Sequence, residues 1–166
     1  MRIQPYDRKA AVRYAHRWAY HRNPEFYDFS DLGGDCTNFV SQCIYAGGGI
    51  MNYTPTYGWY YINANNKAPA WTGVPYLYQF LLRENESVGP NAALVGLNTI
   101  EPGDVIQMSF QGIEYQHTAL VVAVLEPKSP YTVLVAAHSV DTDYRPLSSY
   151  DYTQLRCLHI IGTTAP

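Results

Sequence analysis

The chain has 166 residues, enough for one compact domain with a sizeable hydrophobic core over residues 1–166. Its net charge is -3 and only 15% of its residues are charged, so we expect no nucleic-acid partner. No apolar run approaches the ~20 residues of a membrane span. These features predict a globular protein, expected to be a monomer, without a membrane-spanning segment.

The unusual feature of the composition is its aromatic content, with 16 Tyr and three Trp. Such rings often line polar or peptide-binding grooves, although Tyr also serves as half-buried filler, and composition leaves both open. The three cysteines are odd in number and not clustered, which indicates no disulfide framework. A pairing of Cys43 with Cys157 depends on the fold and stays open.

A first helix is predicted over 8–22. Asp7 is a residue type that caps helix starts, and apolar residues such as Ala11 and Ala15 recur at helical spacing behind it. Asn23 followed by Pro24 is expected to end the helix.

The stretch around Cys36 carries the strongest chemical signal. Gly33 and Gly34 allow a sharp turn, Asp35 is a capping residue type, and apolar residues then recur at helical spacing up to the glycines at 47–49. Cys36 is therefore expected in the first turn of a buried helix, where free backbone N–H groups favour thiolate over thiol. A thiol in this position is a candidate nucleophile, whereas Cys43 further along is expected to be core.

A long loop is expected over 47–72. Its aromatic residues Trp59, Tyr60 and Trp71 are candidates for a wall of a substrate groove, with plain surface packing as the alternative. A further helix is predicted over 75–83, starting at a proline.

After residue 100 the sequence period changes from helix to strand. Four strands are expected, and the stretch 84–98 stays unassigned. Two of the strands are apolar on both faces, as in the middle of a covered sheet. Helices first and an antiparallel sheet second predict an α+β fold. The predicted strands are 105–110, 118–125, 131–137 and 158–161.

Two histidines stand at the ends of the two apolar strands. If 126–129 is the hairpin loop, the numbers of opposed residues sum to 255, which places His117 directly opposite His138. One imidazole can then act as acid and base while the other orients it. A register error of one residue would put the two rings on opposite faces of the sheet.

The arrangement of these motifs resembles a known family, the bacterial "putative amidase" domains of the papain-like superfamily. This group is related to cell-wall endopeptidases of the NlpC/P60 type and to the CHAP amidases. The resemblance covers nearly the whole chain, and the cysteine block is its most specific part. The matching segments are 33–42, 102–105, 117–121, 137–139 and 145–147.

The resemblance implies a papain-like cysteine hydrolase fold, with a nucleophile helix packed on an antiparallel sheet. By position, Cys36 matches the nucleophile, His117 the general base and His138 the residue that orients the base. Asp141 is the rival for this third role, and Asp35 and Asp141 are the candidates for oxyanion or positioning roles. The Cys36 backbone N–H is a natural oxyanion donor, and the second donor is not identified.

The function expected from these residues is amide hydrolysis through a thioester, with peptidoglycan as the implied substrate and no metal or other cofactor. One alternative is a peptidase, isopeptidase or acyltransferase with the same residues. Others are a metal site at Cys36, His117, His138 and Asp141, or a non-catalytic wall-binding module. Residues 1–5 lack the apolar segment of a signal peptide, so the protein either stays in the cytoplasm or works at the cell wall after an export signal was removed.

Overall fold

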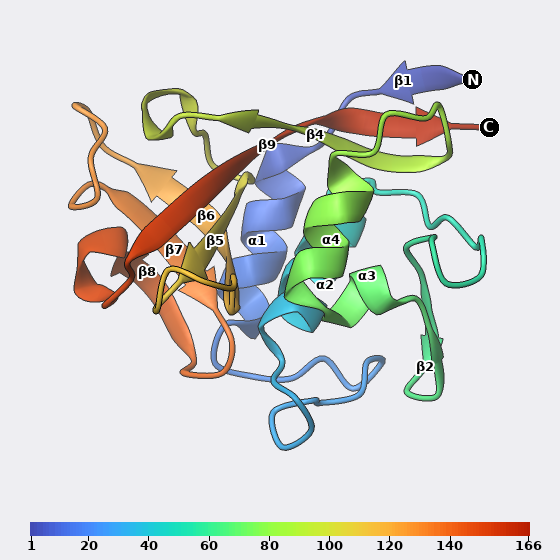
Figure 1. Cartoon of the computed structure of the whole chain (residues 1–166), viewed down its shortest axis with the longest axis horizontal. Helices are drawn as coiled ribbons and strands as arrows, with labels where there is room; N and C mark the ends of the chain where they lie inside the picture. The colour runs from blue at the N-terminus through green and yellow to red at the C-terminus, as the bar shows by residue number, and fades with distance from the viewer.

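The computed structural model describes all of residues 1–166 as a small α+β fold with helices on one face of an antiparallel sheet. In Figure 1, α1, α2 and α4 lie in the middle of the molecule, with strands β5–β8 beside them and β9 running diagonally across. No helix in the structure has the length and apolar character needed to span a membrane. The helices are α1 (Arg8–Trp18), α2 (Cys36–Ala46), α3 (Pro69–Thr72) and α4 (Val74–Leu81).

The main sheet has seven strands in the order β1-β9-β5-β6-β7-β8, and β4 pairs with the other edge of β9. Because β1 pairs with the end of β9, the two chain termini lie together, as Figure 1 shows. The strands are β1 (Arg2–Gln4), β4 (Gly89–Val95), β5 (Val105–Ser109), β6 (His117–Val124), β7 (Val133–Ala137), β8 (Thr142–Pro146) and β9 (Gln154–Ala165), with a separate pair β2 (Tyr61–Asn63) and β3 (Asn66–Lys67).

The sheet separates two hydrophobic clusters. One lies between the sheet and the helices and includes Phe39 of α2 and Leu120 of β6. The other covers the opposite face and includes Val121, which follows Leu120 on the same strand. Neighbouring residues of β6 therefore enter different cores, as the two-residue period of a strand requires. This confirms the prediction of a strand that is apolar on both faces.

The first helix begins where predicted and ends earlier. Asp7 accepts a hydrogen bond from the Ala10 N–H, which is the predicted cap. The helix stops at Trp18 rather than near Arg22, because the Trp18 carbonyl accepts a hydrogen bond from the His138 ring. Residues 19–22 then leave the helix, and the Arg22 side chain pairs with Asp141.

The predicted hairpin register is wrong by one residue. Leu120 lies opposite Ala136, so opposed numbers sum to 256 at this end of the hairpin, and the pairing shifts again between Val121 and Ala123. Because a shift of one residue reverses every side chain, His117 and His138 lie on opposite faces of the sheet. His138 stacks on Phe39 on the helix side, whereas His117 packs against Tyr150 on the other side.

Local sequence pattern did not reveal several of the elements. The short helix α3 falls inside the predicted long loop, and β4 occupies the unassigned stretch 84–98. The last strand is longer than predicted because β9 extends to pair with β1, β4 and β5.

Candidate functional site

Helix α2 begins at Cys36, as predicted, after a turn that depends on glycine. Gly33 and Gly34 have φ of +87° and +100°, in the left-handed region that other residues rarely adopt. The Cys36 side chain is 9% exposed, and its amide N–H has no acceptor in the protein. The thiol therefore stands beside free donors at the start of a helix.

The other polar side chains of the helix start are held by different parts of the fold. Thr37 bonds to Thr118 of β6 with 2.9 Å between hydroxyl oxygens. Asn38 donates to the Tyr27 carbonyl and accepts from the Trp71 indole at 3.0 Å. The Cys36 Sγ lies 3.8 Å from the Thr37 hydroxyl, a weak contact. The nucleophile candidate is thus positioned by its neighbours while its own sulfur stays available.

Asp35 holds the turn before Cys36 from inside the protein. It does not cap the helix; one carboxylate oxygen accepts from the Phe29 N–H and the Asn38 amide, and the other lies 2.5 Å from Nδ1 of His138. Asp35 and His138 are both 1% exposed, so this is a buried ion-paired contact. The geometry gives Asp35 a positioning role, through the loop that presents Cys36.

His138 cannot orient His117, which corrects the predicted three-residue arrangement. Its Nδ1 faces Asp35 and its Nε2 lies 2.7 Å from the Trp18 carbonyl oxygen, so both nitrogens are occupied. Asp141 does not fill the role either, because both of its oxygens bind Arg22 at 2.9 Å. Neither residue contacts His117, and the four residues weighed as metal ligands are not brought together.

Cys36 and His117 share two neighbours, Thr118 and Tyr150. The Thr118 backbone interacts with the Cys36 sulfur and lowers its pKa, so the thiol lies close to the peptide bond that joins His117 to Thr118. Nε2 of His117 is buried without a hydrogen-bond partner, and so is the hydroxyl of Tyr150, whose ring centroid is 5.5 Å from that of His117. Buried polar atoms without partners are uncommon in folded proteins, and two beside one thiol indicate a place built for another molecule.

The charge states of the pair follow from burial. Burial raises the pKa of the Cys36 thiol, and the N–H and hydroxyl groups of Thr118 and Thr37 only partly offset this. Burial, together with the charge of Arg145, lowers the pKa of His117 to about 4. The resting pair is therefore a thiol and a neutral imidazole, which corrects the expectation that the helix start favours thiolate.

The pKa of His117 predicts a pH-dependent stability. Because its folded pKa of about 4 lies below its ordinary value, the unfolded chain binds this proton first as pH falls from 6.5 to 4. We expect the wild type to lose up to about 3 kcal/mol of unfolding free energy in this window relative to His117→Gln. Above pH 6.5 the difference between the two proteins is constant.

Urea unfolding at a series of pH values measures this effect. The exposed His21 supplies the control, since His21→Gln is expected to follow the wild-type curve. Parallel curves for wild type and His117→Gln between pH 7 and 4 would contradict the assignment of a buried, neutral His117.

Two of the three residues proposed for a groove wall belong to the core instead. Trp59 and Trp71 are fully buried, and their indole N–H groups donate to Ser41 and Asn38 of α2. They hold α2 from behind and cannot line an open groove. Tyr60 is half-buried beside Tyr53, and its place in a groove stays a prediction.

Two pockets lie away from this site. A pocket of about 430 Å³ lies beside α4 and is lined by residues such as Asn52 and Arg83. Another of about 710 Å³ lies along α1, next to Arg13 and Trp18. Neither includes Cys36 or His117, so the unpartnered polar atoms carry the assignment.

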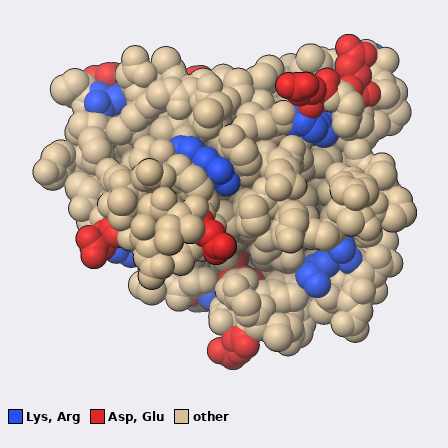
Figure 2. Space-filling view, in the orientation of Figure 1, with Lys and Arg blue, Asp and Glu red and all other residues tan.

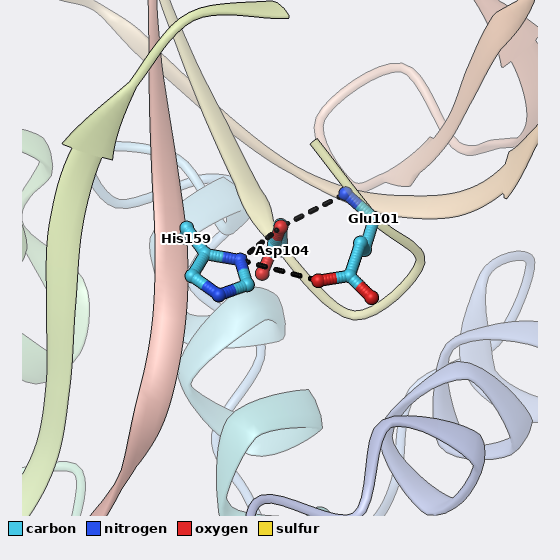
Figure 3. A group of neighbouring side chains, drawn as sticks. All are labelled: Glu101, Asp104 and His159. Atoms are coloured by element: carbon cyan, nitrogen blue, oxygen red, sulfur yellow. Dashed lines mark hydrogen bonds and ion pairs between the residues drawn. The ribbon is translucent and has the colours of Figure 1, made fainter. Parts of the chain in front are cut away.

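A second cluster of titratable groups has a structural role. Figure 3 shows Glu101, Asp104 and His159, whose ligand atoms are close enough to bind a metal ion. Asp104 is fully buried and accepts hydrogen bonds from Arg8 at 2.6 Å and from His159 at 2.9 Å, and further ones from two backbone N–H groups. The Arg8 guanidinium already supplies the positive charge, so the cluster ties α1 to β5 and β9. His159 therefore has a structural role in the fold.

Sequence reasoning missed Tyr150, Gln107 and Arg156. Tyr150 follows β8 after a short 3-10 turn, Leu147–Ser149, and nothing in its local sequence distinguishes it from the other tyrosines. Gln107 and Arg156 lie on β5 and β9, directly opposite each other. Only the pairing of distant strands brings these residues toward Cys36. The three cysteines are free and buried, which leaves the suggested Cys43–Cys157 bond unformed.

Comparisons with known proteins agree with the resemblance in its main part. Residues 5–161 match the family described as "Putative amidase domain". The chain is 36% identical over 151 residues to the "Uncharacterized protein YhbB" of Bacillus subtilis, covering 89% of this chain and 46% of that protein. The chain thus spans less than half the length of this curated relative. No solved structure matches the chain. The chain belongs to the putative amidase domain family, whose description indicates an amidase-type hydrolase.

Proposed function

We propose that the protein is a cysteine-dependent amide hydrolase in which Cys36 is the nucleophile and His117 the general base and acid. The observation that carries the proposal is the position of the Cys36 sulfur, close to the peptide bond between His117 and Thr118. Two buried polar atoms nearby, Nε2 of His117 and the hydroxyl of Tyr150, have no hydrogen-bond partner. A thiol, a neutral imidazole and a free helix-start N–H are the groups that acyl transfer needs.

The reaction proceeds in two halves. His117 takes the proton of the Cys36 thiol as the sulfur attacks the amide carbonyl, and the free N–H of Cys36 stabilises the negative oxygen. His117 then gives this proton to the leaving nitrogen, so that an amine departs and a thioester remains. Water, deprotonated by the same imidazole, attacks the thioester, and the released carboxylic acid and the restored thiol complete the cycle.

The pair operates without a third polar residue hydrogen-bonded to His117. The imidazole is instead packed between aromatic rings, with centroids of Tyr150 at 5.5 Å and Phe110 at 6.4 Å. A nucleophile at the start of a helix that packs on an antiparallel sheet supports the papain-like relationship, which stays a prediction. His138 belongs to the scaffold of this proposed site through Asp35.

We propose peptidoglycan as the substrate, on the strength of the amidase family and the resemblance to cell-wall hydrolases. Peptidase, isopeptidase or acyltransferase activity would use the same steps with another acyl donor or acceptor. Purified sacculi incubated with the protein are expected to release fragments with new amine and carboxylate ends, identified by mass spectrometry. In H₂¹⁸O one heavy oxygen enters each new carboxylate if water is the acceptor.

The Cys36→Ala protein is the blank for this assay. Equal digestion by both proteins would overturn the cysteine mechanism. Cleavage of peptide amides without any cleavage of sacculi would support the cysteine mechanism and exclude peptidoglycan as the substrate.

A further inference from the structure

A row of polar side chains leads from the proposed nucleophile across three adjacent strands. Thr118 of β6 lies opposite Gln107 of β5, and Gln107 lies opposite Arg156 of β9. The Gln107 amide donates to the Thr118 hydroxyl at 3.3 Å and accepts from the Arg156 guanidinium at 2.7 and 2.9 Å. Since neighbouring strands are about 4.8 Å apart, Arg156 stands about 10 Å from the strand position that holds the Cys36 sulfur.

The Arg156 guanidinium is fixed in place. Its central carbon lies 3.5 Å from the ring centroid of Tyr78 on α4 and 3.8 Å from that of Tyr115 in the loop before β6. Stacking by two rings and the two hydrogen bonds to Gln107 leave the group little freedom of rotation. A guanidinium held in this way loses little entropy when it binds a ligand.

The charge of this guanidinium has no partner. No Asp or Glu oxygen lies within 4.0 Å, in contrast to Arg8 and Arg22, which pair with carboxylates. Burial lowers the pKa of Arg156, and the only groups that oppose the shift are Tyr78 and Tyr115. Nη1 donates to no protein atom and is not among the buried unpartnered atoms, so solvent or a ligand reaches it.

We propose that Arg156 binds a carboxylate of the substrate, two strands away from the strand position beside the Cys36 sulfur. A planar guanidinium with free N–H groups and no counter-charge suits a carboxylate. Figure 2 shows one face of the molecule, on which the charged side chains stand as separate groups in a largely uncharged surface. The substrate class is therefore an acidic peptide amide, and this inference rests on the proposed function.

Two peptides with the same scissile amide test the inference, one with a free carboxylate and one with that group converted to a carboxamide. We expect the wild type to favour the carboxylate peptide in kcat/KM by about 10- to 100-fold, the effect of a charge-assisted hydrogen bond. Arg156→Gln is expected to reduce this preference to near one, and Arg156→Lys to retain part of it. Arg17→Gln, an exposed arginine on a tryptophan ring of α1, is expected to keep the full preference.

Binding to the Cys36→Ala protein separates this inference from the proposed function. Calorimetric titration is expected to give tighter binding of the carboxylate peptide than of the carboxamide peptide, and Arg156→Gln in the same background is expected to remove the difference. Equal binding of the two peptides overturns the carboxylate site, whatever the assay shows about hydrolysis. If the carboxylate peptide binds selectively but the wild type hydrolyses neither peptide, the carboxylate site at Arg156 is supported and the amidase proposal is overturned.

Discussion

Replacing Cys36 with alanine is expected to lower kcat/KM for amide hydrolysis by about 10⁴-fold or more, the scale seen when a covalent nucleophile is removed. No other side chain of the first turn can take its place, because Thr37 and Asn38 are committed to Thr118 and Trp71. The measurement is steady-state hydrolysis of a peptide amide, with the folded state of the variant checked by circular dichroism.

Cys43 provides a matched control on the same helix. It is fully buried two turns beyond Cys36 and touches no part of the proposed site, so Cys43→Ala is expected to retain activity. His117→Gln is expected to lower kcat/KM by about 10²- to 10⁴-fold, the usual share of a general base. Activity that survives Cys36→Ala but not His117→Gln would point to a water nucleophile and exclude the thioester.

Breaking the contact between Asp35 and His138 is expected to have the largest effect on stability. Both side chains are almost completely buried, and removing one leaves the other without its partner. Asp35→Ala or His138→Ala is therefore expected to cost about 3–5 kcal/mol of unfolding free energy. Urea unfolding of both single variants and the double variant measures the coupling between them.

The control for this pair is Asp141→Ala. Asp141 also forms an ion pair near the site, with Arg22, but its side chain is 30% exposed. A loss of about 0–1 kcal/mol is expected there. If Asp35→Ala costs no more than Asp141→Ala, then the buried contact does not hold the Cys36 turn.

Activity gives a second measure of the same contact. Asp35 accepts hydrogen bonds from the Phe29 N–H and the Asn38 amide, on the two sides of the turn that presents Cys36. His138 holds the other carboxylate oxygen of Asp35, so its removal loosens this turn. We expect His138→Ala to lower kcat under conditions where the protein remains folded, with its pH profile unchanged. A shifted acidic limb in this variant would instead place His138 among the groups that exchange protons with the substrate.

The tryptophans show why the composition misled the prediction of a groove. Each buries its ring and donates its indole N–H to a polar residue of α2, as a buried tryptophan must if its N–H is not to lose a partner. The glycine-rich chain after α2 therefore returns to support the helix from behind. A list of aromatic residues does not say which way the rings face.

The sequence by itself determined the local features of the site. Two glycines and a short polar residue before an apolar helical period located the start of α2 at Cys36, and Asp7 located the start of α1. These features depend on backbone conformation and capping within a few residues, which local pattern records. The strand that begins at His117 was likewise predicted to within one residue.

Only the tertiary structure decided which side chains surround the thiol. A difference of one residue in hairpin pairing moved His138 to the helix side of the sheet, where it binds Asp35, and left His117 with Tyr150. Successive side chains of a strand alternate between faces, so the smallest error in register exchanges one set of neighbours for the other. The row from Thr118 to Arg156 likewise exists only because β9, the last strand, pairs with β5, which no local pattern specifies.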